Sequence, residues 1–550
     1  MTKKMETTIL KSRLILVPVL VMLLFAASVY ASAPGITGPT FNLSAQDAFI
    51  SQPDGASIYS WGYGCNGNPA GYAPAAITAT FCNNMQVPGP TLIVTEGQTV
   101  IVSLINNLPA AAGNTSILFP GFNVAATGGV VGLMTQEAPP DGTTVVTYTF
   151  TATTPGTRAY YSGTQGDLQI EMGMYGAIIV LPNNATVLSG CASAQASNQA
   201  ARGFWGESDF RLAAAAYDHP DSCYDREYMF QFSEIDPDIH KKALAQVTAK
   251  NGCLAGAPAC SLNVPTEPYH PAYFMINGRS MPDDMDPNYA IQYPHQPYNG
   301  NPHMHPGELV LIRVIGTGRW QHPFHEHANH VRVLGRDGNL ILSPSTITYA
   351  GSSTPAPALA GPLLFTTSTV PGQTVDGIFY FTGKGLNWDM YGHNPASSDT
   401  SAKLTCTPDA NGYNTGAPTA INYYEWCQDH NKPLQVAPFG DVAGGGPATL
   451  PDPNIFANGP WYGGSPYLGP DATLRATGCS TGPQANATCG QTGSTPPSGT
   501  IANSPSGEAG FAFMWHSHNE REITTNNIFP GGMLMMMLVD SREFQIDESM

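Results

Sequence analysis

The sequence predicts an all-β protein built from antiparallel β-sandwiches. Short runs rich in β-branched and aromatic residues recur along the chain, at residues 91–104, 144–151, 177–181, 308–314 and 331–334. The 58 glycines and 48 prolines punctuate the chain throughout, and long helical periodicity is hard to find. Short strands separated by turn residues are typical of β-sandwiches.

The first expected element is a secretory signal peptide at residues 1–31. Four basic residues precede an apolar run from about residue 14 to 27, and small residues follow it. This order is typical of a signal peptide, with cleavage after Ala31 or Ala33. An uncleaved N-terminal anchor is the alternative. We expect a secreted or periplasmic protein with no membrane span after signal cleavage.

Two domains are expected after this segment. The first covers residues 40–185, a connector covers 186–225, and the second covers 226–540. An insertion at about 394–506, rich in Gly, Pro, Ser, Thr and Asn, interrupts the second domain. A loop this long is exceptional in a compact domain. A third domain inside the insertion is the alternative.

All ten cysteines lie after the expected signal peptide. An even count suits an oxidising compartment. Pairing of sequence neighbours would give five disulfides: Cys65–Cys82, Cys191–Cys223, Cys253–Cys260, Cys406–Cys427 and Cys479–Cys489. Spacing alone does not settle the connectivity.

The charge of the chain limits the classes of partner that it is expected to bind. Charged residues make up 11% of the sequence and the formal net charge is −18. We do not expect this acidic chain to bind nucleic acid, because nucleic-acid-binding proteins usually carry a basic stripe on their surface. The expected partners are a metal ion and a redox or extracellular protein.

Two histidine-rich segments contain the candidate metal ligands. The first reads His-Pro-Phe-His-Glu-His from residue 322, and the second reads His-Ser-His from residue 516. Alternate residues of a strand point to one face, so each His-x-His pair aims two imidazoles at one place. The candidate ligands are His325, His327, His516 and His518. Imidazole suits copper, zinc, iron and nickel.

Both segments resemble the C-terminal cupredoxin domain of the multicopper oxidases. In that family, His-Pro-x-His-x-His provides one ligand to a type 1 copper and two to a trinuclear copper cluster. A later His-Cys-His provides the type 1 thiolate and two more cluster ligands. The resemblance implies tandem cupredoxin-like Greek-key sandwiches with a long loop-rich insertion in the second. It also implies copper as the cofactor, and His322 as the type 1 histidine.

The chain departs from this family pattern at the type 1 site. Ser517 occupies the position of the type 1 cysteine, and Glu522 that of its second histidine. A hydroxyl cannot replace the soft thiolate of a blue copper site. The intact family passes electrons through this cysteine to the cluster, so laccase-like turnover is not expected, and whether the chain is an enzyme stays open.

Half of the cluster histidines are also missing. Residues 87–100 resemble the opening strands of the family's first domain, and residues 156–180 its closing strands. The four ligand positions of that domain hold Leu118, Pro120, Tyr161 and Gly163. The resemblance therefore implies a degenerate member that retains four cluster histidines from one domain.

The roles of the neighbouring residues are open. Glu520 and Glu522 continue the alternation after His518; as ligands they would favour zinc, manganese or iron, and otherwise they are solvated charges. His322 is either a structural histidine or part of a repurposed site with Glu522. The third pair, His303 and His305, matches no family ligand and is expected at the surface.

Two functions follow as hypotheses. The first is an exported multicopper-oxidase-like protein with a residual His-rich copper site, used for metal binding or limited redox chemistry. The second is a non-enzymatic extracellular binding or assembly protein on a cupredoxin scaffold.

Overall fold

The computed structural model describes residues 33–74, 82–349, 355–382, 384, 406–420, 423–424, 426–427, 464–467, 510–540, 542 and 546. The expected signal peptide, most of the expected insertion, and Cys479 and Cys489 lie outside these residues. Among the helices of the described part, none combines the length and the apolar character that crossing a bilayer requires.

The N-terminal sandwich consists of two five-stranded sheets. One has the order β11 (Gly156–Tyr161), β12 (Tyr175–Leu181), β5 (Leu92–Thr95), β1 (Gly35–Thr37) and β4 (Tyr72–Ala73). The other has the order β3 (Ser57–Cys65), β2 (Thr40–Ser51), β6 (Thr99–Asn106), β10 (Val146–Thr151) and β7 (Ala125–Gly128). Their facing side chains, among them Trp61, Val102 and Tyr148, form one buried core.

The C-terminal sandwich also consists of two sheets. The inner sheet has the order β14 (Tyr273–Ile276), β13 (Arg226–Ile235), β16 (Leu309–Gly316), β24 (Thr374–Tyr380), β18 (Val331–Arg336) and β19 (Asn339–Leu340), with β22 (Leu363–Leu364) on β18. The outer sheet has the order β15 (His303–Met304), β27 (Leu534–Asp540), β26 (Gly510–Ser517), β17 (His322–Glu326) and β23 (Thr366–Thr369), with β25 (Gly464–Tyr467) on β26. Thus part of the expected insertion adds a strand to the outer sheet.

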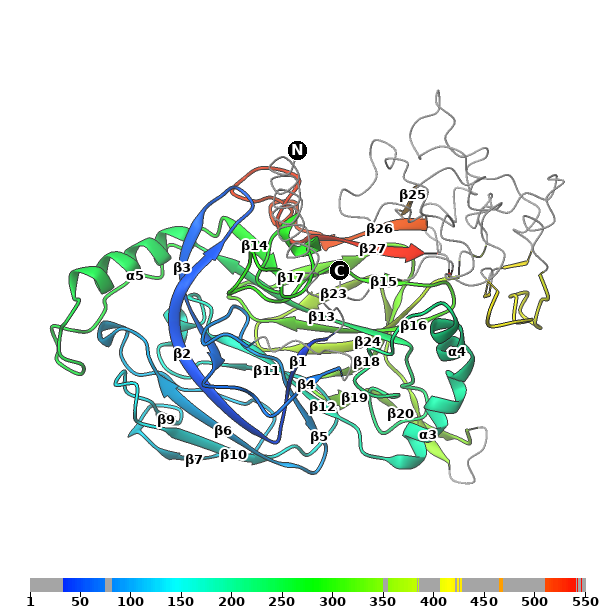
Figure 1. Cartoon of the computed structure of the whole chain (residues 1–550), viewed down its shortest axis with the longest axis horizontal. Helices are drawn as coiled ribbons and strands as arrows, with labels where there is room; N and C mark the ends of the chain where they lie inside the picture. Colours follow the sequence, from blue (N-terminus) through cyan, green and yellow to red (C-terminus); the bar gives the residue numbers. More distant parts are fainter. Residues whose placement is uncertain are drawn as a thin grey trace, which may run out of the picture.

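The four sheets stack as layers, as Figure 1 shows, with β26 and β27 at one side and β6, β7 and β10 at the other. Strand β13 lies in the middle of this stack and is buried along its whole length. Phe230 and Phe232 on one face pack into the C-terminal core, whereas Met229 on the other packs against Ala177 and Ile179 of the first sandwich. The outer sheet is therefore the layer farthest from the first sandwich.

Polar contacts also join the two sandwiches. The Asp376 carboxylate accepts hydrogen bonds from Thr157 Oγ1 at 2.6 Å and from Tyr217 at 2.6 Å. Arg313 donates to Thr157 Oγ1 at 3.1 Å and pairs with Glu227 at 2.9 Å. All of these groups are buried, so this network holds the inner sheet against β11.

Helices and short ribbons complete the described fold. They are α2 (Gly166–Gln169), α3 (Ala185–Ala194), α4 (Ala196–Phe204), α5 (Pro237–Ala249), the 3₁₀ turns η1 (Ala110–Ala112) and η2 (Asp283–Met285), and the ribbons β8 (Val130–Val131) with β9 (Gln136–Glu137) and β20 (Leu342–Ile347) with β21 (Ala356–Leu359). Helix α5 was not expected from the sequence. Its start signal was present, however, because Asp236 caps the helix by accepting from Asp238 N and Pro237 occupies the first turn.

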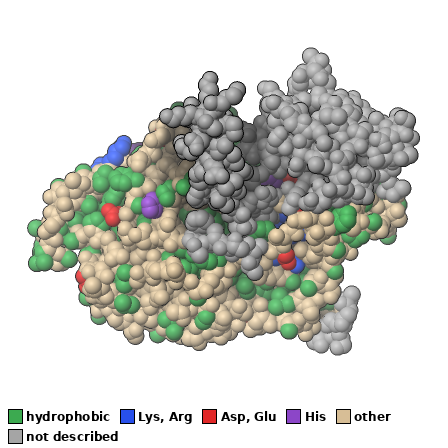
Figure 2. Space-filling model, in the orientation of Figure 1, with side chains coloured by type: hydrophobic (Ala, Val, Ile, Leu, Met, Phe, Trp, Pro, Cys, Tyr) green, Lys and Arg blue, Asp and Glu red, His purple; other side chains and the backbone are tan. Residues whose placement is uncertain are grey.

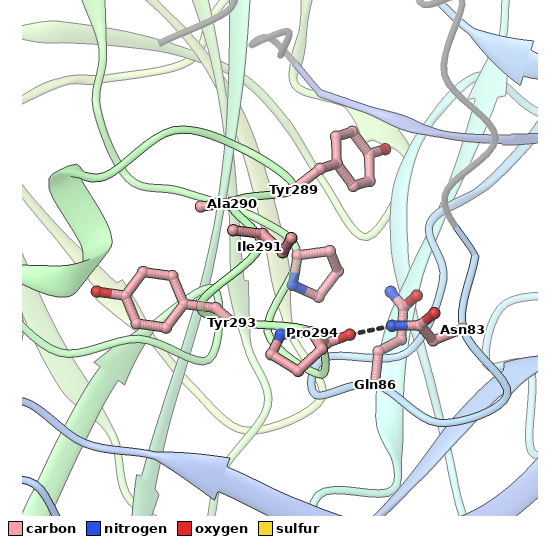
Figure 3. A pocket seen from close by; sticks show the side chains of 8 residues that line it. Asn83, Gln86, Tyr289, Ala290, Ile291, Tyr293 and Pro294 are labelled. Atoms are coloured by element: carbon pink, nitrogen blue, oxygen red, sulfur yellow. Dashed lines mark hydrogen bonds between the residues drawn. The ribbon is translucent and has the colours of Figure 1, made fainter. Parts of the chain in front are cut away.

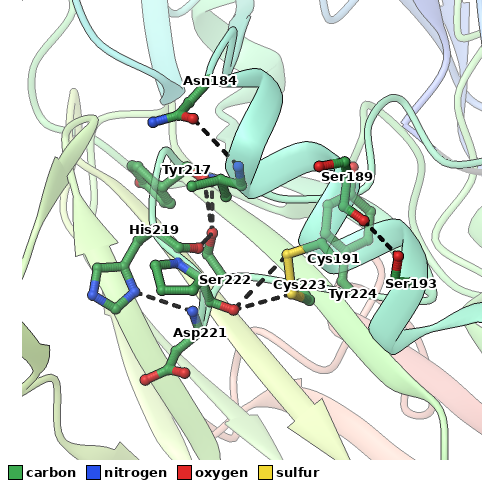
Figure 4. Close-up of a disulfide and its surroundings, with 12 residues drawn as sticks. Asn184, Ser189, Cys191, Ser193, Tyr217, His219, Asp221, Ser222, Cys223 and Tyr224 are labelled. Carbon is green, nitrogen blue, oxygen red and sulfur yellow. Dashed lines mark hydrogen bonds between the residues drawn. A yellow bond between two sulfur atoms is a disulfide. The ribbon is translucent and has the colours of Figure 1, made fainter. Parts of the chain in front are cut away.

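Four of the five expected disulfides are confirmed: Cys65–Cys82, Cys191–Cys223, Cys253–Cys260 and Cys406–Cys427. Figure 4 shows how Cys191–Cys223 ties α3 to the turn that holds His219 and Ser222. The fifth expected pair lies outside the described residues. Each described cysteine is paired.

The described fold confirms the prediction of tandem β-sandwiches of the all-β class. The boundaries at 40–185, 186–225 and 226–540 stay predictions, although the last segment begins where β13 does. Figure 2 shows a face with few charged side chains, as the low charged fraction of the sequence leads one to expect.

Candidate metal site

The two histidine segments lie side by side in the outer sheet. Strands β17 and β26 are antiparallel neighbours, and their register places His325 directly opposite His516. Phe324 and Trp515, the adjacent residues in each strand, point into the C-terminal core. Since neighbouring side chains of a strand point to opposite faces, His325 and His516 share the face away from that core.

The four predicted histidines converge on this outer face. The ring centroid of His325 lies 4.9 Å from that of His327, 5.5 Å from that of His516 and 4.7 Å from that of His518. Nitrogen atoms of His325, His327 and His516 all lie within 4.8 Å of one another. The structure thus brings the four rings together, and their role as ligands stays a prediction.

Hydrogen bonds orient two of these rings. His516 Nδ1 lies 2.7 Å from the carbonyl oxygen of Ser517, which can only accept, so this nitrogen carries the proton. His325 Nδ1 lies 2.7 Å from Thr366 Oγ1. These contacts leave Nε2 as the ligand atom of His516 and make it the natural ligand atom of His325.

The surroundings lower the pKa values of two outer-face imidazoles. Burial lowers the pKa of His325, and the nearby rings of His327, His518 and His516 lower it further, to about 4. Burial also lowers the pKa of His516, against the opposing effect of its hydrogen bond to Ser517. A neutral imidazole is the form that coordinates a metal, so these two rings are in the form that could bind one at neutral pH.

The expected continuation of the pattern to Glu520 and Glu522 is wrong. Strand β26 ends at Ser517, and residues 520–523 form a turn, so the two-residue alternation stops at His518. The Glu520 side chain is 80% exposed and reaches only 4.0 Å from His518 Nδ1. Glu522 is completely buried on the other side of the sheet, away from the four histidines.

A different histidine site occupies that inner side. His322 Nδ1 lies 2.9 Å from Glu522 and its Nε2 lies 2.9 Å from Glu234, with all three side chains fully buried. Ser517 donates a hydrogen bond to the same Glu522 oxygen, and Asn519 donates to the other at 2.8 Å. His322, Ser517 and Glu522, which the resemblance placed at the type 1 position, therefore do lie together, but as a hydrogen-bonded cluster.

The two carboxylates decide the charge of His322. Burial by itself would lower the pKa of His322, but the hydrogen bonds to Glu234 and Glu522, together with their charges, raise it to about 9. Both ring nitrogens are therefore protonated at neutral pH and neither offers a lone pair to a metal. The structure thus places His322 and Glu522 together in a hydrogen-bonded cluster, and not as a pair of neutral metal ligands.

Glu234 was not singled out from the sequence. It lies on β13, in the inner sheet, and accepts from the backbone N–H groups of Arg319 at 2.6 Å and Trp320 at 2.8 Å. Nothing in its neighbourhood in the sequence marks it, because it reaches His322 only through the packing of one sheet on the other.

The expectation that His303 and His305 are exposed is also wrong. His303 lies on β15 and His305 directly follows this strand, with 7% and 1% of their surfaces exposed. His303 Nδ1 lies 3.1 Å from the Asp540 carboxylate, and His305 Nε2 lies 2.6 Å from Glu207. β15 pairs with the closing strand β27, and this pairing buries both histidines.

The first domain shows what replaced its ligands. Leu118 and Tyr161 form a backbone bridge, with Leu118 N donating to Tyr161 O at 2.8 Å. A Cβ atom at Gly163 would lie 2.8 Å from Leu118 Cγ. A histidine at 163 would therefore require Leu118 to move.

A pocket between the two sandwiches is a second place to consider. Figure 3 shows its lining: Asn83, Gln86, Tyr289, Ala290, Ile291, Tyr293, Pro294 and Pro297. Asn83 donates to the Pro294 carbonyl across the domain boundary. No acidic, basic or histidine side chain lines this pocket, so metal or acid–base chemistry points to the outer sheet instead.

Comparisons with known proteins give one family profile and several similar solved structures. Residues 69–185 match the family profile described as multicopper oxidase. No curated protein matches. Similar solved structures include the blue copper oxidase of Nitrosomonas europaea (14% identity, 91% of this chain and 85% of that chain, TM-score 0.40) and the copper nitrite reductase of the same organism (20%, 62% and 84%, 0.33).

The laccase of Botrytis aclada is also similar, at 19% identity over 64% of this chain and 48% of that chain, with a TM-score of 0.34. The family profile matches residues 69–185, which is most of the first expected domain. In this part of its sequence the chain is similar to the multicopper oxidases.

Proposed function

We propose that the chain is an exported multicopper-oxidase-like protein that binds one copper ion through the histidines of its outer sheet. The observation that carries this proposal is the convergence of His325, His327 and His516, whose nitrogens lie within 4.8 Å of one another. Imidazole nitrogens are good copper ligands, and copper has the highest affinity in the divalent series.

The spacing of the donors fits a metal site. His516 Nε2 and His327 Nε2 lie 3.3 Å apart. Two ligands at about 2.0–2.1 Å from one ion, in tetrahedral arrangement, are separated by roughly 3.4 Å. At the same distance, one ring can donate a hydrogen bond to the other. A bound metal would take the place of the proton between the two nitrogens, so the two rings would need to move little to bind it.

The chain's own residues limit the chemistry. When bound, copper would supply a one-electron redox centre. Thr366 and the Ser517 carbonyl hold two of the imidazoles in the orientation described above. Ser517 provides no thiolate for electron entry, so we propose metal binding or limited redox chemistry in place of laccase turnover. Zinc, manganese and iron remain the competing metals. The group of possible ligand atoms found among the described residues holds three histidines and no carboxylate, and nitrogen ligands favour copper over manganese.

Copper titration tests this proposal. The purified protein, stripped with a chelator, should bind one Cu²⁺ per chain in calorimetry and give a paramagnetic resonance spectrum with nitrogen ligands. His325→Ala combined with His516→Ala should abolish stoichiometric binding and leave the circular dichroism spectrum unchanged. His270→Ala is the matched control, because His270 is an exposed single histidine. Full binding by the double variant would place the metal elsewhere.

Export and a redox or extracellular protein partner belong to the same proposal. The paired cysteines support an oxidising compartment, and the expected signal peptide at 1–31 agrees with it. Mass spectrometry of the mature protein should find an N-terminus at residue 32 or 34. An intact N-terminus on secreted material would contradict signal cleavage.

One observation favours the second function, a non-enzymatic binding or assembly protein. The hairpin of β8 and β9 exposes a run of apolar side chains, with Val131 86% and Leu133 93% exposed. Exposed apolar patches often mark interaction surfaces. If the wild-type protein binds no copper, and Val131→Ser with Leu133→Ser reduces self-association in sedimentation velocity, this function replaces the first.

A further inference from the structure

The four outer-face histidines are not equivalent. His325, His327 and His516 form the compact group of nitrogens, and the ligand atoms of His518 lie outside it. His325 and His516 are 2% and 7% exposed, whereas the side chain of His518 is 50% exposed. The sequence pattern treats His516 and His518 as a matched pair, so this difference arises from the fold.

The position of His518 in the sheet explains its exposure. His516 lies inside β26, opposite His325, where the ladder fixes its backbone. His518 lies one residue beyond the end of β26 and is held by a single backbone hydrogen bond from its N–H to Pro323 O, at 2.8 Å. The chain then turns away at residues 520–523. His518 is therefore the histidine at the solvent rim of the cluster.

The contacts of the His518 ring also differ. Its centroid lies 4.7 Å from that of His325 and 5.5 Å from that of His516, within reach of an ion held by the other three. The nearest charged group is the exposed Glu520 carboxylate, 4.0 Å from His518 Nδ1. No hydrogen bond comparable to that of His516 with the Ser517 carbonyl fixes the ring among the bonds of the described residues.

We propose that His325, His327 and His516 hold the ion permanently, and that His518 is an exchangeable fourth ligand which a small anionic donor from solvent can displace. This inference rests on the proposed function, because it concerns the same metal. Sites that act on small molecules commonly combine three protein ligands with one exchangeable position, whereas structural sites are closed by four protein ligands. The half-exposed rim is the side from which a hydroxide-sized or azide-sized anion can enter.

The proposal predicts unequal losses when the histidines are removed one at a time. Even loss of a hydrogen-bond partner of a metal ligand costs about 10–100-fold in affinity. His516→Ala removes a permanent ligand, so its Cu²⁺ affinity should fall by more than about 100-fold. His518→Ala should still bind one Cu²⁺ per chain, with a loss below roughly tenfold.

Azide is the probe for the exchangeable position. Titration of Cu²⁺-loaded protein with azide, followed by the azide-to-copper absorption and by paramagnetic resonance, should show tighter azide binding in His518→Ala than in wild type. His518→Gln, which keeps a polar side chain at the rim, guards against a folding defect in the alanine variant. His270→Ala should behave as wild type in every measurement.

The outcomes separate this inference from the proposed function. If wild type binds no Cu²⁺, the proposed function fails and this inference with it. If wild type binds one Cu²⁺ and His518→Ala loses affinity as severely as His516→Ala, His518 is a permanent ligand and only this inference is overturned. If both His518 variants match wild type in Cu²⁺ and azide affinity, His518 is not a ligand, and the inference is again overturned while the copper site stands.

Discussion

Strand β17 presents two histidines, three residues apart, to two opposite chemical environments. His325 on the outer face lies among three other imidazoles, and its pKa is lowered to about 4. His322 on the inner face lies between Glu234 and Glu522, and its pKa is raised to about 9. At neutral pH the first is a neutral imidazole and the second a cation.

The difference shows how the surroundings of each histidine set its charge. On the outer face, burial lowers the pKa of His325 and of His516, in the latter against the charge of Glu520, so these two imidazoles keep a lone pair at neutral pH. On the inner face, Ser517 and Glu522 replace two soft or neutral ligands, and a buried imidazolium now lies where the resemblance would place a copper ion. Protonated His322 thus supplies a positive charge to a pocket that contains two carboxylates.

The largest expected effect comes from removing the inner imidazolium. His322→Ala leaves Glu234 and Glu522 buried with no cation between them, and breaking a buried ion pair in this way costs about 3–5 kcal/mol. Denaturant unfolding of the metal-free protein should show this loss. His518→Ala, at the rim of the outer face, should change the free energy of unfolding by less than about 0.5 kcal/mol. Equal losses from both variants would remove the distinction between the two faces.

The glutamates at the end of the second histidine segment should also differ. Glu522→Gln removes a buried acceptor of hydrogen bonds from His322, Ser517 and Asn519, and should cost about 1.5–3 kcal/mol. Glu520→Gln alters an exposed side chain and should stay within about 0.5 kcal/mol. Thermal or denaturant unfolding of the two single variants, at one pH, provides the measurement. A larger loss from Glu520→Gln would contradict the inward position of Glu522.

The pH dependence of stability should have opposite slopes for the two faces. The pKa of His322 is higher in the folded than in the unfolded protein, so its stabilisation is complete below about pH 6.5 and is lost as pH rises through 9. The pKa of His325 is lower in the folded protein, so its effect is a loss of stability as pH falls from 6.5 towards 4.

Variants isolate these slopes from those of other groups. Without metal, the His322→Gln variant should not show the loss of stability that the wild type shows as pH rises towards 9. The His325→Gln variant should not show the loss that the wild type shows as pH falls towards 4. Unfolding free energies measured from pH 4.5 to pH 9.5 test both. A His322→Gln curve parallel to wild type above pH 6.5 would show that this imidazole is not a cation at neutral pH.

The smallest expected effect concerns the absorption spectrum of a Ser517 variant, in which no blue-copper band should appear. Ser517→Cys restores a thiol on the inner face, but Glu522 still occupies the position of the second histidine and His322 is protonated. Copper-loaded Ser517→Cys should therefore lack the intense thiolate-to-copper absorption of a blue site, which needs two imidazoles beside the sulfur. Ser517→Cys combined with Glu522→His is the comparison variant. A blue single variant would contradict the assignment of Glu522.

Much of the candidate site could be read from the sequence, because its signal is local. Residues two apart on a strand share one face wherever the strand lies. This spacing relates His325 to His327 and His516 to His518. The missing thiolate at Ser517 is likewise a property of one position. Pairing of neighbouring cysteines was the preferred expectation without being settled by their spacing, and four of the five expected pairs are confirmed.

Only the tertiary structure decided how these residues are partnered. Glu234 meets His322 across two packed sheets, and His303 and His305 are buried because β15 pairs with β27, which begins more than 200 residues later. Periodicity could not show that β26 ends at Ser517, after which a turn carries Glu522 inward and leaves His518 at the rim. Side-chain alternation is set by the backbone geometry of one strand, whereas burial and charge depend on which distant strands pack against it.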